Sequence, residues 1–136
     1  MANTTFSGPV RSENGFEQIT KNTSTGAITT DAIYNATIRG GVQTLSGAGA
    51  VNLTDLITEL TTAAGAAAVT LADGSTSGQI KIINHIVDGG GTATVTPTTF
   101  ANGSTIAFDA VGESVTLVWN STVGWVASSV NGATVA

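Results

Sequence analysis

The chain has 136 residues, of which 41% are hydrophobic and 10% charged, with a formal net charge of −5 and no cysteine. This length suits one domain of ordinary size with an appended arm, and the apolar content argues against a disordered chain. The acidic balance argues against nucleic-acid binding, the lack of cysteine excludes disulfides and thiolate metal sites, and no apolar run approaches the roughly 18 residues of a membrane span.

The charges are distributed unevenly along the chain. Residues 1–40 contain three cations and three carboxylates, whereas residues 41–136 contain Lys81 alone against six carboxylates. We therefore divide the chain into a neutral arm, 1–40, and an acidic body, 41–136. Aromatic residues make up only 5% and charged residues 10%, a composition that often belongs to proteins with much uncharged polar surface inside an assembly.

The first forty residues show no sustained helical or strand period, because glycine, proline and asparagine interrupt them every few residues. Single large apolar residues stand apart along the whole segment: Phe6, Val10, Phe16, Ile19, Ile28, Ile33, Tyr34 and Ile38. We interpret the segment as an extended arm whose apolar anchors dock on another protein surface. A ragged, half-disordered terminus is the alternative.

The body begins with two short strands, 42–45 and 50–53, around a glycine-rich turn. The next segment, 55–68, is ambiguous. Some of its apolar residues have helical spacing and its alanines favour a helix, whereas four threonines and Gly65 oppose one. We favour a strand, a turn near Gly65 and a second strand through 66–71, because this suits the surrounding pattern.

From residue 68 onward, runs rich in valine, isoleucine and threonine alternate with Asp-Gly and Asn-Gly turn signals. The predicted strands are 68–71, 79–87, 92–97, 105–109, 114–120 and 126–130. The final residues, 133–136, are expected to be loose or capped by a neighbour. The pattern predicts an all-β fold, a small antiparallel β-sandwich or barrel-like domain preceded by the extended arm, with no helix longer than about two turns.

His85 is the only histidine of the chain. A metal site needs partner ligands, and neither a second histidine nor a cysteine exists. We therefore expect His85 to face solvent or a subunit boundary from its strand. A pH switch at such a boundary is the alternative, because histidine titrates near neutrality.

The other residues with chemical potential have structural explanations. Asp73, Asp88 and Asp109 lie at or beside turns, where aspartate caps backbone amides, and a calcium site would need several acids in one short loop. The run 89–91 is Gly-Gly-Gly, but no Lys-Ser/Thr pair follows it, and no Gly-x-Ser-x-Gly elbow is present. We predict no catalytic, cofactor-binding or metal-binding residue and do not expect an enzyme.

Trp119 and Trp125 flank a hairpin-like turn. Two tryptophans so close in sequence can stack a sugar when they are exposed. In a body this poor in aromatic residues, we favour their use as the main packing mass of the core.

Several segments of the body resemble a small β module of virion proteins from tailed bacteriophages, especially marine and cyanobacterial ones. The matching segments are LADG at 71–74, GQIK at 78–81, DGGGTATVTP at 88–97, IAF at 106–108 and VGESVTLVW at 111–119. The opening ANTTFSGPVRSENGF, at 2–16, is similar to the start of structural proteins from the same phages.

The resemblance implies a structural virion protein. In that group the module occurs in capsid decoration proteins, head fibres and tail-fibre segments, commonly as trimers. We expect a decoration (cement) protein that forms a homotrimer, binds the major capsid protein on the outer surface of the head and stabilises it, since the chain is short for a fibre. A head-fibre, tail-fibre or tip segment that binds host-surface glycans is the alternative.

The expected location is the outer capsid surface of the virion, after synthesis in the host cytoplasm. We expect no cofactor and neither nucleic acid nor membrane as a partner. The capsid contacts are assigned to the arm, with apolar residues in pockets and arginines on acidic capsid groups: Phe6, Val10, Arg11, Phe16, Ile19 and Arg39.

Overall fold

The structure is a computed structural model that describes residues 16–34 and 38–136, with side chains described at 22–29 and 40–136. The chain divides into two units, Met1–Gly40 and Gly41–Ala136. The first unit contains a three-stranded antiparallel sheet in the order β1-β2-β3, formed by β1 (Phe16–Lys21), β2 (Ile28–Tyr34) and β3 (Ile38–Arg39).

The turn between β1 and β2 is built by local polar groups. The Asn22 side-chain oxygen accepts hydrogen bonds from the amides of Ser24 and Thr25, each at 2.9 Å, and Gly26 adopts a φ of 76°. Asparagine and glycine supply this geometry without tertiary help. The sequence analysis found no strand period in this part of the chain, because pairing partners on neighbouring strands are not visible in a local pattern.

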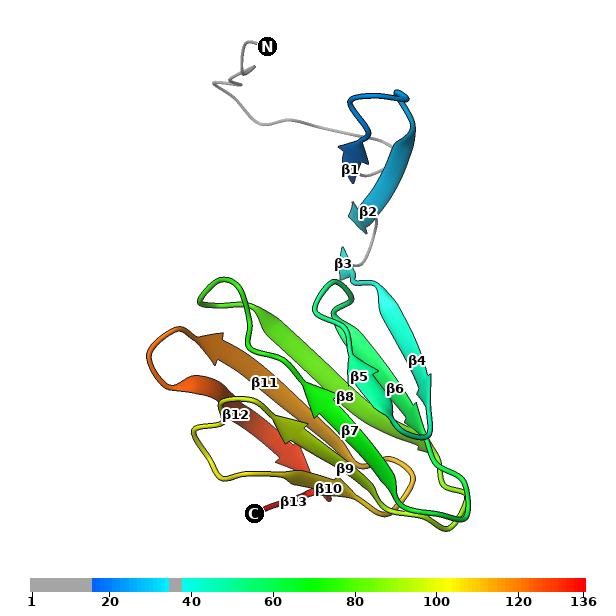
Figure 1. The fold of residues 1–136 in the computed structure, drawn as a ribbon, viewed down its shortest axis with the longest axis vertical. Coiled ribbons are helices and arrows are strands. Elements are labelled where there is room, and N and C mark those ends of the chain that lie inside the picture. The colour runs from blue at the N-terminus through cyan, green and yellow to red at the C-terminus, as the bar shows by residue number, and fades with distance from the viewer. Residues whose placement is uncertain (1–15, 35–37) are drawn as a thin grey trace. The chain divides into compact units, whose positions relative to one another are not determined.

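The second unit, the body, is a sandwich of two five-stranded sheets (Figure 1). The first sheet has the order β12-β11-β8-β6-β4. Its strands are β4 (Val42–Ser46), β6 (Ile57–Thr61), β8 (Ile80–Val87), β11 (Ser114–Asn120) and β12 (Gly124–Asn131). The second sheet has the order β13-β10-β9-β7-β5. Its strands are β5 (Gly49–Val51), β7 (Ala67–Leu71), β9 (Ala93–Pro97), β10 (Ile106–Phe108) and β13 (Thr134–Val135).

The predicted all-β sandwich is confirmed, and the described residues contain no helix. The predicted antiparallel pairing is found in one part of the sandwich, and the rest is parallel. The pairs β4–β6, β6–β8, β5–β7 and β7–β9 are parallel, and only the pairs made by β10 to β13 are antiparallel. From β4 to β9 the chain alternates between the two sheets, so each strand returns to its own sheet in the same direction as the strand before (Figure 1).

The core follows from the side-chain alternation of the strands. In β7, β9 and β11 every second side chain is buried, as a strand with one face in the core requires. The largest buried side chain is Trp125, which is 0% exposed, and its ring lies edge-on to Trp119 with centroids 5.4 Å apart. Its indole N–H donates to the Ala72 carbonyl at 2.9 Å. Trp119 is 8% exposed, so the preference for packing over sugar stacking is confirmed.

The last residues are part of the fold rather than loose. β13 pairs with β10, and Ala133 is buried. The Ala136 amide donates to the Thr105 carbonyl at 3.0 Å, and its carbonyl accepts from the Thr105 amide at 2.9 Å. The expectation of a loose terminus is therefore wrong, because Val135 packs against the core as the second sheet's edge.

Two of the predicted turn glycines serve close packing instead of a left-handed backbone. A Cβ built on Gly74 would lie 2.4 Å from Cγ of Trp119, and one on Gly91 would meet backbone carbonyl oxygens of Ala63 and Gly65. Neither glycine has a positive φ. The glycine run 89–91 is thus a strand connection pressed against the β6–β7 turn.

Candidate interaction surface

The six residues assigned to capsid contact lie in the first unit. Phe6, Val10 and Arg11 lie outside the described residues. Phe16 and Ile19 belong to β1 and Arg39 to β3, where the backbone alone is described. Their assigned contacts stay a prediction.

The outer face of the first sheet carries an apolar strip that the sequence analysis did not single out. We call it the apolar face and define it by Val42, Ile57, Ile80, Ile82, Val118 and Val126. The register aligns Val42 with Ile57 and Ile57 with Ile82, and places Ile80 beside Val118 and Val118 beside Val126. Val42 is 50% and Ile80 47% exposed. Strand alternation sets this face, because the intervening residues of β6, β8 and β11 are buried.

The outer face of the second sheet has a different character. Its aligned side chains are all alanine or threonine: Ala50, Ala68, Thr70, Thr94, Thr96, Ala107 and Thr134. Such side chains leave little apolar area in water. Of the two sheet faces, the apolar face therefore has more to gain from a partner, on the order of 1 kcal/mol for each half-exposed side chain that becomes buried.

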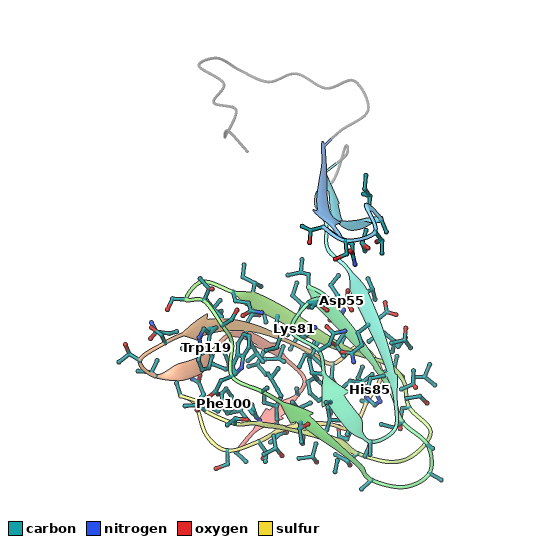
Figure 2. All side chains as sticks on the ribbon, turned by 45° about the horizontal axis from the view of Figure 1, so that its top comes forward. Asp55, Lys81, His85, Phe100 and Trp119 are labelled. Carbon is teal, nitrogen blue, oxygen red and sulfur yellow. The ribbon has the colours of Figure 1, made fainter. Side chains whose placement is uncertain are left out.

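The charged surface of the body has one sign. Lys81 is its only cation, and this side chain is 1% exposed. The Lys81 ammonium donates to the Asp55 carbonyl at 2.7 Å. Burial lowers the pKa of Lys81 from 10.5 to about 8, although the Asp55 carboxylate acts in the opposite direction. Figure 2 shows Asp55 and Lys81 next to each other.

The loop around Asp55 is held by side chains. Asn52 donates through Nδ2 to Oδ2 of Asp55 at 2.6 Å and accepts the Asp55 amide at 2.9 Å. Gln79 donates through Nε2 to the Leu53 carbonyl at 2.9 Å. The buried lysine therefore helps to hold this loop in place, and its charge is not exposed to a ligand.

His85 does not face solvent or a boundary, as was expected, but lies in the interior with 1% of its surface exposed. Its Nδ1 is 3.0 Å from the Ala110 carbonyl oxygen, which can only accept, so Nδ1 carries the proton. Nε2 lies 3.3 Å from the Thr62 hydroxyl oxygen, and the same hydroxyl is 3.3 Å from Oδ1 of Asp88. The strand period of β8 places His85 on the same face as Lys81 and Ile83, and packing between the two sheets makes that face the inward one.

The acidic turn residues behave as the sequence indicated in part. Oδ1 of Asp88 accepts the Gly90 amide at 2.7 Å, and Oδ2 of Asp73 accepts the Thr99 hydroxyl at 3.2 Å. At the turn that begins with Asp109, the capping group is Glu113 instead, whose Oε2 accepts the Asp109 amide at 2.6 Å. Within residues 16–34 and 38–136, no three metal-ligating side chains come together.

The sequence analysis did not single out Gln43, a side chain that closes one edge of the sandwich. Gln43 donates through Nε2 to the Ala50 carbonyl and accepts the Asn52 amide through Oε1, both at 2.9 Å. These two backbone groups flank Val51 on the side of β5 away from β7. The carboxamide thus takes the place of one more strand, and the Thr58 hydroxyl donates to the same Oε1 at 3.1 Å. No sequence signal distinguishes this glutamine from a solvent-exposed one.

No protein-family model matches the chain, and no curated protein matches its sequence. In the part of the chain that the structure describes, no helix is long and apolar enough to cross a membrane.

Proposed function

We propose that the protein is a structural protein of a tailed-bacteriophage virion, a capsid decoration (cement) protein that binds the outer surface of the head and stabilises it. The observation that carries this proposal is the apolar face on an otherwise uncharged or acidic sandwich. The resemblance of segments 71–74, 78–81, 88–97, 106–108 and 111–119 to phage virion modules supports it, and these segments fall on β7 to β11 and their connections.

The interior supports a structural rather than a catalytic role. Inside the fold, the Lys81 ammonium bonds to a backbone carbonyl, and the two ring nitrogens of His85 lie within hydrogen-bond distance of a carbonyl and a hydroxyl. Across the described side chains, no buried polar atom lacks a hydrogen-bond partner. A catalytic group needs free hydrogen-bonding capacity directed at a substrate, so the proposed role needs none of these residues for chemistry.

The proposed assembly is a homotrimer on the major capsid protein. Joining copies through the apolar face would bury valine and isoleucine side chains that are half exposed in one copy, which favours association. Residues 1–40 have no net charge, whereas the body is acidic. This difference suits two separate roles, in which the first unit contacts the capsid and the body projects from it.

A head-fibre or tail-fibre segment that binds host glycans is the second candidate, favoured by the uncharged threonine and alanine face of the second sheet. Sugar stacking by Trp119 and Trp125 is not part of it, because both rings are buried.

Copy number separates the two candidates. Quantitative mass spectrometry of purified virions, normalised to the major capsid protein, is expected to give hundreds of copies per particle, and cryo-electron microscopy should place their density on the outer head. A handful of copies located at the tail would contradict the decoration role and favour the fibre.

A further inference from the structure

The four edge strands of the sandwich differ in how they are protected against pairing with another chain. Native sheets protect edges with short strands, charges, prolines, bulges or covering segments. β13 has only two residues, and β5 is closed by the Gln43 carboxamide. β12 has a register shift, and residues 99–102 cover part of it: Trp125 N donates to the Thr99 carbonyl at 3.0 Å and Ala127 N to Oδ1 of Asn102 at 2.8 Å.

Within the body, residues 41–136, β4 has none of these protections. Its sequence, VQTLS at 42–46, contains no charge, proline or glycine, and its ladder with β6 has no register shift. The strand ends the order of the first sheet. It is long enough for a partner strand to pair along it.

The register shows which backbone groups of β4 have no bond within the body. The Ile57 amide donates to the Gly41 carbonyl at 3.1 Å, and the Gly47 amide donates to the Thr61 carbonyl at 2.9 Å. In a parallel ladder with this phase, alternate residues from 41 to 47 bond to β6. The N–H and C=O groups of Val42, Thr44 and Ser46 therefore point away from the sheet, a row of three donors and three acceptors.

We propose that this row pairs with β4 of a second copy of the chain, antiparallel about a two-fold axis at Thr44. Val42 then lies opposite Ser46 of the second copy, and Thr44 lies opposite its own equivalent. In this arrangement each strand donates N–H groups to carbonyl groups of the other and accepts from its N–H groups. The side chains opposite each other are threonine and threonine or valine and serine, so no like charges face each other. The apolar face becomes continuous across the joint, because Val42, its outermost member, lies on the paired strand.

Electrostatics permit this occupant although the body is acidic. The carboxylate nearest to the centre of β4 is Glu59, which the register places beside Thr44. The two Glu59 residues would be three strand spacings apart, about 14 Å. This exceeds the Debye length of about 8 Å at physiological salt, so their repulsion is largely screened. A five-residue strand pair buries less than the roughly 1,000 Å² of a stable interface, so the contact is reversible.

This inference goes beyond the proposed function and does not depend on it. A two-fold contact cannot build a trimer by itself. If three copies associate through another surface, the β4 contact joins such trimers in pairs, and the same substitutions will dissociate hexamers instead of dimers.

The test uses the full chain and three substitutions at one position. Thr44→Pro removes the free amide and places the ring toward the second copy, but breaks no bond to β6. Thr44→Lys places like charges opposite each other across the axis while setting a lysine beside Glu59 within the sheet. Thr44→Ala keeps the backbone and is the matched control. Urea unfolding followed by tryptophan fluorescence confirms that each variant is folded.

Sedimentation velocity from about 10 μM to 1 mM is expected to show reversible association of the parent chain and of Thr44→Ala. Thr44→Pro and Thr44→Lys should weaken it at least about tenfold. In amide exchange, the amides of 42, 44 and 46 should gain protection with concentration while those of 43 and 45 do not change. A chain that shows no association at 1 mM, or equal association of all variants, overturns the proposal.

Disulfide cross-linking tests the two-fold geometry. Because the chain has no native cysteine, each disulfide must join introduced cysteines. Across a hydrogen-bonded antiparallel pair the Cα atoms are about 5.5 Å apart, within disulfide range. Thr44→Cys should therefore form a disulfide dimer under mild oxidation. Ser46→Cys should not, since its equivalents would be about 14 Å apart, but it should cross-link with Val42→Cys. Equal dimer formation by Ser46→Cys alone would refute this register.

Discussion

At the scale of single residues, the body places two titratable side chains, Lys81 and His85, in its interior, where each bonds to groups from segments distant in sequence. Lys81 bonds to a backbone carbonyl, and His85 bonds to a carbonyl and a hydroxyl. Satisfied in this way, the groups hold loops in place at the ends of the strands. Figure 2 shows Lys81 near the middle of the sandwich, with His85 and Trp119 toward opposite ends.

The buried ammonium of Lys81 predicts a specific pH dependence of stability. The folded pKa is about 8 and the ordinary value is 10.5, so between these values the unfolded chain binds more protons than the folded chain. The free energy of unfolding therefore rises as the pH increases from about 8 to 10.5. The difference corresponds to at most about 3 kcal/mol.

Urea unfolding followed by tryptophan fluorescence, at pH 7 to 10.5, measures this rise. Lys81→Met is the comparison, because other groups that titrate in the same range contribute equally to both proteins. We expect the rise to be larger in the parent chain than in the variant. Parallel curves for the two proteins would show that the ammonium is not desolvated in the fold.

Gly74 provides a second prediction at this scale. Gly74→Ala would place a Cβ within 2.4 Å of the Trp119 ring, so the ring must move or the turn must shift. Overpacking of this kind lowers the free energy of unfolding by about 1–3 kcal/mol. Near-UV circular dichroism should also change, because the Trp119–Trp125 pair is disturbed. Gly65→Ala is the matched control: nothing lies within 4 Å of its added Cβ, and its φ is not positive. If both variants have the same free energy of unfolding, the close approach of Gly74 to Trp119 does not contribute to stability.

At the scale of secondary-structure elements, the edge strands β4 and β5 differ in whether their outward backbone groups are hydrogen-bonded. Gln43 extends from β4 and bonds to the free groups of β5, so one glutamine protects one edge while its own strand is left open. A side chain with one donor and one acceptor in a plane is needed here, because the two groups of β5 are a carbonyl and an amide.

The role of Gln43 is tested by Gln43→Leu. The substitution leaves the Asn52 amide, the Ala50 carbonyl and the buried Thr58 hydroxyl without their partner, which is expected to lower the free energy of unfolding by about 1–3 kcal/mol. The Asn52 amide should exchange with solvent much faster. Thr44→Ala, at the next position of the same strand, is expected to stay within about 0.5 kcal/mol of the parent. Unchanged exchange at Asn52 would show that the carboxamide does not occupy the ladder.

At the scale of the whole molecule, the chain consists of two units with separate internal structure. The core cluster identified in the body is formed by residues between Leu45 and Val135. We therefore expect the body to fold without the first unit.

Deleting residues 2–40 is predicted to leave a folded body, judged by a cooperative unfolding transition, but to abolish binding to undecorated phage heads in a co-sedimentation assay. The physical reason is that the deletion removes the three cations of the first unit, Arg11, Lys21 and Arg39, and the apolar anchors Phe6 and Phe16. Full occupancy by the truncated protein would show that the body itself binds the capsid.

The sequence by itself determined where most strands of the body lie, but not which face of each strand is buried: in β8 the apolar Ile80 and Ile82 face outward, whereas Lys81 and His85 are buried. The alternation in GQIKII predicted β8, and the threonines and Gly65 within 54–65 correctly favoured β6 and a turn over a helix. Both conclusions depend on side chains within a few residues of each other. The alternation did not reveal the apolar face, because that face depends on which strands are neighbours in the first sheet.

Only the tertiary structure decided which strands are neighbours. Asp73-Gly74 and Asp88-Gly89 show that the chain reverses, but a reversal can lead to the adjacent strand or across to the other sheet, and the local conformation of a turn does not distinguish the two. The crossing makes β4 to β9 parallel, buries His85 and Lys81 between the layers, and brings Gln43 to β5. These features depend on contacts between distant segments, so the local sequence pattern could not reveal them.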